Sequence, residues 1–152
     1  MAYTSEEARR QLLDDLAEAI DQLGLALASL GEAYEEVDEV VGDRLEQELF
    51  RPVQGAYGRG RRTHAEFAGR HGIEARAFGP GSPGLHSADP RVYLERAIDA
   101  TERADHVVAE MQDSLLPVEV GDRELREGLT ETRELIAAVP GRGRQLLRTI
   151  GR

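Results

Sequence analysis

The sequence predicts an all-α protein, and specifically an antiparallel four-helix bundle with long heptad-patterned helices and one long Gly/Pro-rich connection. Three observations predict it. Apolar residues recur at alternating steps of three and four in several long segments, short breaks separate most of these segments, and no stretch shows the strict alternation of a strand. Because short connections favour antiparallel neighbours, an up-and-down bundle follows. The alternative is a long helical hairpin whose exposed seam is completed by a second copy of the chain.

The first helix is predicted over residues 5–41, and Thr4 with Glu7 has the spacing of a capping box at its start. Its apolar positions follow the 3.5-residue repeat of a helical seam. They are Leu13, Leu16, Ile20, Leu23, Leu27, Leu30, Tyr34, Val37 and Val41. The seam continues through Gly31, so we expect the helix to pass this glycine, with a break there as the alternative.

A second helix is predicted over residues 44–71, after a stop at Gly42 and a new capping box from Asp43 and Glu46. Pro52 is expected to kink this helix or to mark its true start. The residues expected towards the core are Leu45, Leu49, Val53, Tyr57, His64, Phe67 and His71. Several glycines make this segment a poor helix in isolation, so packing must stabilise it.

Residues 72–89 form the one long irregular connection, and the helices after it have clear start signals. Asp89 followed by Pro90 suits an N-cap and first position, and a third helix is predicted over 90–115, ended by Pro117. A fourth helix is predicted over 122–139, capped by Asp122 and broken at Pro140 and Gly141, with a short C-terminal helix over 142–150. The expected seams of these helices are Leu94, Ala97, Thr101, Ala104, Val108, Met111 and Leu115, then Leu125, Leu129, Thr132, Ile136 and Val139.

Length and composition indicate one domain over residues 1–152. No apolar run approaches the length of a transmembrane helix, and the first residues show no apolar signal-peptide core, so we expect a cytoplasmic protein. The chain has no cysteine, which excludes disulfides, thiolate metal ligands and cysteine nucleophiles.

The formal charge of −10 is unevenly distributed along the chain. Acids dominate residues 32–48, whereas residues 51–76 carry six arginines and two glutamates, and no acid follows Glu134. A candidate contact surface of Arg59, Arg61, Arg62 and Arg70 is therefore predicted, with Glu32, Glu35, Glu36 and Glu39 as its complement. The simpler interpretation is that these charges neutralise one another within the chain or lie in solvent.

No catalytic residues, metal ligands or cofactor are predicted. Residues 79–84 match G-x-G-x-x-G by letter, but no strand precedes them and two prolines lack the N–H that a pyrophosphate needs. Glu-x-x-His, His-Glu-x-x-His and Gly-x-Ser-x-Gly are all absent. His64 takes a seam position, and with Phe67 and His71 it marks a candidate pocket beneath the connection.

Three functional hypotheses follow. The first is a non-catalytic bundle that acts through protein–protein association, with self-association into a homo-oligomer as its main form. The second is a bundle that binds a small ligand or metal near His64, Phe67 and His71. The third is anion or nucleic-acid binding through the arginine clusters, against which the acidic composition argues.

Overall fold

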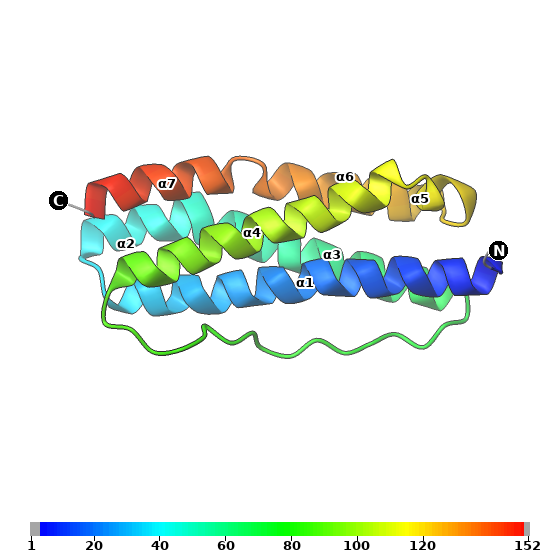
Figure 1. Ribbon diagram of the computed structural model, residues 1–152, viewed down its shortest axis with the longest axis horizontal. Helices are drawn as coiled ribbons and strands as arrows, with labels where there is room; N and C mark the ends of the chain where they lie inside the picture. Colours follow the sequence, from blue (N-terminus) through cyan, green and yellow to red (C-terminus); the bar gives the residue numbers. More distant parts are fainter. Residues whose placement is uncertain (1–3, 151–152) are drawn as a thin grey trace.

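The computed structural model describes residues 4–150, and these residues form helices and irregular connections with no strand (Figure 1). In chain order the elements are α1 (Ser5–Glu35), α2 (Glu39–Leu45), the π-helical turn η1 (Glu46–Phe50), α3 (Arg51–Arg70), α4 (Pro90–Asp113), α5 (Leu116–Glu119), α6 (Arg123–Ile136) and α7 (Val139–Ile150). The all-α prediction is confirmed for this part of the chain.

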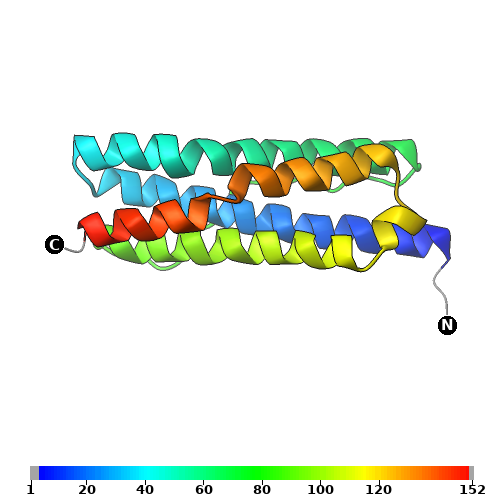
Figure 2. The same cartoon turned by 90° about the horizontal axis from the view of Figure 1, so that it is seen from above.

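The long helices lie side by side along one axis, as Figures 1 and 2 show from two directions. Five helices, α1, α3, α4, α6 and α7, pack against one another. The most extensive contacts join α1 to α4 and α3 to α6, followed by α1 to α3 and α4 to α7. Their buried apolar side chains form one hydrophobic core, which extends along the length of the molecule.

The core face of α1 has two rows of buried residues where the sequence predicts one. The predicted seam is buried as far as Leu30, with Leu27 only partly covered, but Tyr34 is 45% exposed. The second buried row consists of alanines seven residues apart, Ala19, Ala26 and Ala33. Small side chains let a neighbouring helix approach closely, and they are weak signals in a search for large apolar residues.

The first turn lies at residues 36–38, so the predictions of a turn at Gly31 or Gly42 are both wrong. The side chain of Asp38 begins α2 by accepting a hydrogen bond from the Val41 backbone N–H at 2.9 Å. Because Asp38 starts a new helix, α1 and its apolar seam end before Gly42, where the sequence predicts the stop.

Gly42 lies inside α2 and serves packing. A Cβ at this position would lie 3.2 Å from the ring of Tyr34, so a larger residue would press on that side chain. The predicted capping box of Asp43 and Glu46 does not form, because both residues lie in continuous helical backbone.

The second helical segment starts earlier than predicted and is continuous from Glu39 to Arg70 through α2, η1 and α3. Pro52 lies in the first turn of α3, directly after the π-helical turn, where the Arg51 N–H donates to the Glu46 carbonyl. Proline has no N–H to donate, and the wider turn before it interrupts the α-helical pattern without reversing the chain.

Pro90, Pro117 and Pro140 lie in the first turns of helices and do not end the helices that precede them. The helix predicted over 90–115 ends at Asp113, and Pro117 lies in the first turn of α5. The prediction that Pro117 terminates the helix is therefore wrong. The first turn of a helix does not use its N–H groups, so proline is tolerated there.

The helix predicted over 122–139 is likewise shorter, and the break lies at residues 137–138, before Pro140. Asp122 caps α6 as predicted, accepting from the Leu125 N–H at 2.8 Å. The C-terminal helix, predicted over 142–150, begins at Val139, because Pro140 fits its first turn.

Residues 72–89, here called the strap, are irregular as predicted and run back along the length of the molecule from the end of α3 to the start of α4 (Figure 1). Gly81 of the strap lies so close to α1 that a Cβ would stand 2.3 Å from the backbone of Gly24. Farther along, Arg96 of α4 donates to the carbonyls of Pro83 and Leu85 at 2.8 and 2.7 Å.

Candidate interaction surface

The arginine cluster (Arg59, Arg61, Arg62 and Arg70) is used largely within the protein. Arg59 forms an ion pair with Glu131 of α6, and it also donates to the Thr63 hydroxyl at 2.8 Å. The Arg59 guanidinium lowers the pKa of the Glu131 carboxyl. Arg62 lies 3.6 Å from Glu66 on its own helix. These acids belong to α3 and α6, and not to the predicted complement on α1 and α2.

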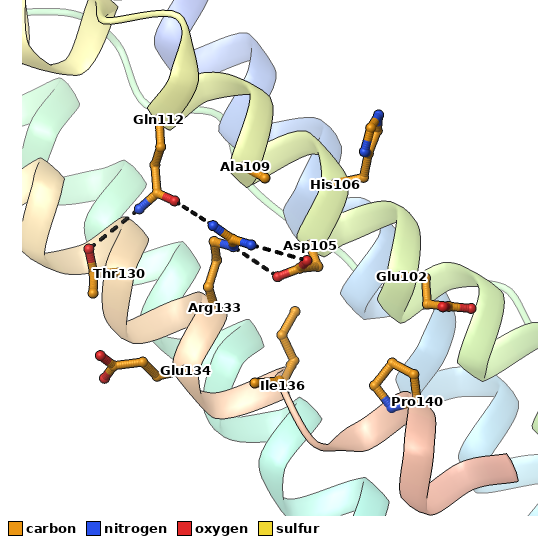
Figure 3. Close-up of a pocket in the computed structure, with 11 residues that line it drawn as sticks. Glu102, Asp105, His106, Ala109, Gln112, Thr130, Arg133, Glu134, Ile136 and Pro140 are labelled. Atoms are coloured by element: carbon orange, nitrogen blue, oxygen red, sulfur yellow. Dashed lines mark hydrogen bonds and ion pairs between the residues drawn. The ribbon is translucent and has the colours of Figure 1, made fainter.

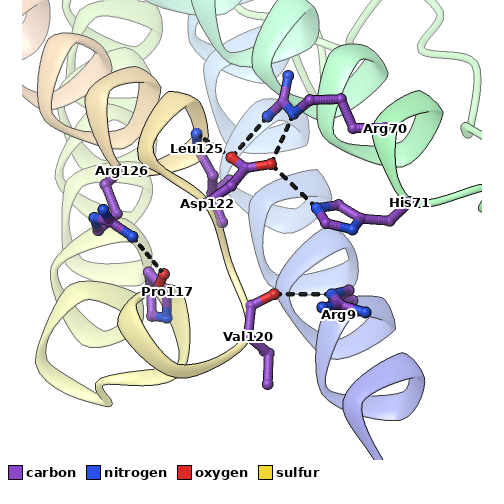
Figure 4. A network of polar contacts seen from close by, with 8 residues as sticks. All are labelled: Arg9, Arg70, His71, Pro117, Val120, Asp122, Leu125 and Arg126. Atoms are coloured by element: carbon purple, nitrogen blue, oxygen red, sulfur yellow. Dashed lines mark hydrogen bonds and ion pairs between the residues drawn. The ribbon is translucent and has the colours of Figure 1, made fainter.

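Arg70, the last arginine of the cluster, binds the Asp122 carboxylate (Figure 4). Arg70 donates two hydrogen bonds to this carboxylate, at 2.7 and 2.8 Å, and His71 Nε2 lies 3.1 Å from the same group. Burial raises the pKa of Asp122, but the bonds from Arg70, the Leu125 N–H and His71 outweigh burial and lower the pKa to about 2. The carboxylate therefore caps α6 and joins it to the end of α3.

The same network fixes the corner formed by α5. Arg9 of α1 donates to the Val120 carbonyl at 2.9 Å, and Arg126 donates to the Pro117 carbonyl at 3.4 Å (Figure 4). Leu115, just before α5, has a left-handed φ of 68°. A leucine in this conformation is strained, so the surrounding contacts must stabilise the turn.

The acidic corner, defined by Glu32, Glu35, Glu36 and Glu39, lies at the opposite end, around the turn from α1 to α2. None of these carboxylates forms an ion pair within residues 4–150. Two large apolar side chains lie exposed among them, Tyr34 at 45% and Val40 at 72%. Exposed apolar side chains among unpaired charges distinguish this corner from the arginine cluster.

A notch of about 340 Å³ opens beside the acidic corner. Its lining is mostly apolar and includes one carboxylate from α1 and one from η1. The lining residues are Gly31, Tyr34, Glu35, Leu45, Glu46 and Phe50. A notch with apolar walls and an acidic rim fits a side chain that is apolar in its body and cationic at its tip.

Helix α7 carries arginine and no acid. Arg144 pairs with Glu102 of α4 at 2.6 Å, whereas Arg142 and Arg148 have no ion-pair partner in the described part of the chain. The C-terminal end of α7 and the α1–α2 turn lie at the same end of the molecule (Figures 1 and 2). The acidic corner and the C-terminal end of α7 therefore share one end of the molecule.

The three residues of the predicted pocket have different surroundings. His64 is buried, with 3% exposure, and its ring meets that of Phe78 from the strap edge-on, with centroids 5.2 Å apart. Phe67 is fully buried and lies 4.6 Å from the His71 ring. His71 itself faces Asp122.

A pocket of about 180 Å³ does lie beside His64, between α1 and the start of the strap. Its charged walls are Arg10, Asp14, Glu74 and Arg76. Neither Phe67 nor His71 lines it.

A groove of about 830 Å³ lies between α4 and the junction of α6 with α7 (Figure 3). Arg133 crosses it, pairing with Asp105 at 2.9 Å and donating to Gln112 at 2.9 Å. Gln112 donates in turn to Thr130 at 3.4 Å. Because these polar groups satisfy one another, the groove is bridged by the protein's own side chains.

Within residues 4–150, no three His, Asp or Glu side chains gather in a way that could hold a metal ion. No helix among these residues has the length and apolar character needed to cross a membrane. Comparison of the chain with protein-family models, curated proteins and solved structures finds no match.

Sequence reasoning missed two features of this surface. Tyr34 belongs to the apolar seam by spacing, but it lies in the last turn of α1 and is 45% exposed. The partners of Arg59 and Arg70 lie 72 and 52 residues away, and no local signal links them.

Proposed function

We propose that the protein is an antiparallel four-helix bundle that works by protein–protein association and not by catalysis, with a second copy of the chain as its partner. One observation carries the proposal: the carboxylates of the acidic corner have no ion-pair partner within residues 4–150, and the exposed Tyr34 and Val40 lie next to Glu35 and Glu39 in the chain. The arginine cluster does not fill this role, because three of its four guanidiniums hold acids of the same chain.

The complement that we propose for the acidic corner is α7, through Arg142 and Arg148. The C-terminal end of α7 lies at the same end of the molecule as the acidic corner. A two-fold rotation can therefore place the acidic corner of each copy against α7 of the other, making the same contact twice and closing the assembly as a dimer.

Apolar contacts must supply most of the affinity. Solvent-exposed ion pairs contribute little, about 0 to 1 kcal/mol each, whereas burial of Tyr34 and Val40 removes apolar surface from water. The charges set the orientation and the choice of partner, and they make the association sensitive to salt.

Reciprocal charge reversal tests the proposal. The double variant Glu35→Arg/Glu36→Arg and the double variant Arg142→Glu/Arg148→Glu should each sediment as monomers at low salt. Mixed in equal amounts, they should form a heterodimer, because each supplies the surface that the other has lost.

The control is Asp113→Arg/Glu119→Arg, which makes the same change in charge at the α5 end and should leave the dimer intact. If both reversed variants dimerise as the wild type does, or if their mixture stays monomeric while the wild type is dimeric, the proposed pairing is wrong.

The pocket beside His64 favours small-ligand binding as a second candidate function. Asp14 and Glu74 line it and have no ion-pair partner among residues 4–150, whereas Arg10 and Arg76, which also line it, pair with Glu6 and Asp21. A small cationic group would therefore find two unpaired carboxylates there. Native mass spectrometry of the purified protein, with thermal shifts in a panel of amines, tests this candidate. A ligand-free mass and no shift with any amine would reject it.

A further inference from the structure

His64 has an unusual position for a titratable side chain. It is 3% exposed, and its Nδ1 atom has no hydrogen-bond partner. The strap covers it with the Phe78 ring, which stands at 89° to the imidazole. The enclosure suits a neutral imidazole, because a buried polar atom without a partner already carries a cost that a charge would increase.

We propose that residues 74–80 of the strap form a latch over His64, which opens when the imidazole takes up a proton. A protonated ring has two N–H donors, and Nδ1 has no acceptor in the closed state. Swinging Phe78 away admits water, which hydrates the cation without disturbing the helices.

The charged groups around His64 come from α1 and from the strap. Arg10 and Asp14 face it from α1, and Glu74 and Arg76 from the strap. Burial is the largest influence and lowers the pKa of His64 below its ordinary value of 6.5; Arg76 lowers it further, while the Leu13 backbone and Asp14 act in the opposite direction. The closed latch is therefore fully stable above pH 6.5 and loses stability as the pH falls below that value.

Weak contacts hold the latch itself. Arg76 donates two hydrogen bonds to the Asp21 carboxylate, at 2.8 and 3.0 Å, but both side chains are 51% exposed, so solvent and salt screen the pair. The Arg76 guanidinium also lies 4.6 Å from the centre of the Phe78 ring. The Tyr57 hydroxyl donates to the Gly79 carbonyl at a long 3.3 Å.

Firmer anchors limit the opening on both sides. Ile73 is buried, and its N–H donates to the Ala68 carbonyl at 2.9 Å. On the other side, Gly81 packs against the backbone of Gly24. The moving part therefore lies between Ile73 and Gly81, within a single chain, and the latch does not depend on self-association.

A single tryptophan tests the latch, since the chain has none of its own. In a Phe78→Trp variant, we expect acrylamide quenching of the emission to rise severalfold between pH 7.5 and pH 5, with the change lying below pH 6.5. The matched control adds His64→Phe, which cannot take up a proton, and its quenching should stay at the low value of the closed state. Equal rises in both variants, or no rise in either, would overturn the proposal.

A second measurement uses the unsubstituted protein. In an NMR titration, the amide signals of Ala77 and Gly79 should shift with the same midpoint as the ring of His64. The exposed His106, at 73% side-chain exposure, serves as the reference for an imidazole far from the strap. Strap signals that do not move, or that follow another midpoint, would contradict the latch whatever the tryptophan variant does.

Discussion

At the α5 end, Asp122 is held by Arg70, His71 and the Leu125 backbone, whereas at the other end Glu35 and Glu36 have no ion-pair partner among residues 4–150. Charges of the first kind join α3 to α6 and fix the fold. Charges of the second kind repel one another in the isolated chain, and they become favourable only when another molecule brings cations to them. The comparison separates the charges that build the protein from those that are available to a partner.

The largest expected effect concerns the close approach of α3 to α6, the two helices that Asp122 and Arg70 join at the α5 end. A Cβ at Gly128 would lie 2.2 Å from the Thr63 hydroxyl and 2.9 Å from its Cβ. Because no rotamer of Thr63 removes both contacts, Gly128→Ala should destabilise the fold by about 3 kcal/mol in urea unfolding. The control is Gly58→Ala, on an open face of α3, which should stabilise slightly because alanine favours helix. A Gly128→Ala protein as stable as wild type would show that the helices are farther apart.

Removal of the Asp122 side chain should have the next largest effect. Asp122→Ala loses the cap of α6 and the partner of Arg70, and we expect a loss of about 2 kcal/mol in unfolding free energy. Asp122→Asn keeps an acceptor for the Leu125 N–H and should lose about half as much. If Glu36→Gln costs as much as Asp122→Ala, the distinction between the two ends fails.

Acid should lower the free energy of unfolding by protonating the Asp122 carboxylate. The pKa of Asp122 is about 2 in the folded protein and 3.8 in its ordinary state. Its contribution is therefore present above pH 3.8 and is lost as the pH falls towards 2, by up to about 2 kcal/mol. Unfolding free energies measured between pH 5 and pH 2 should fall more steeply for wild type than for Asp122→Asn. An equal loss of unfolding free energy with pH in the two proteins would show that Asp122 is not its source.

The smallest effect on the fold, and the most informative in sign, is expected at the acidic corner. Glu35→Gln/Glu36→Gln relieves repulsion and should raise the stability of the monomer by no more than about 0.5 kcal/mol. The same change should weaken self-association, because it removes charges that α7 of the partner would meet. A variant that loses fold stability would indicate an internal partner for these glutamates.

The sequence predicted the features that depend on neighbouring residues. The Thr4–Glu7 capping box, the Asp89 and Asp122 caps and the irregular strap are all present, because each rests on a few consecutive side chains. The seam of α4 is buried through Met111 for the same reason.

Features that depend on distant residues were not predictable in this way. Glycine is typical of helix ends, but Gly42 lies inside a helix and leaves room for the Tyr34 ring, which only the folded turn brings near. His64 was predicted at the core from its spacing, yet its neighbour Phe78 comes from the strap, whose path no periodic pattern specifies. The acidic partners of Arg59 and Arg70 are also remote in sequence.

Sedimentation equilibrium of the wild-type protein at micromolar concentration, in low and in high salt, tests the central claim most directly. We predict twice the monomer mass at low salt and dissociation towards the monomer as salt screens the acidic corner from α7. A monomer mass at every salt concentration would contradict the claim.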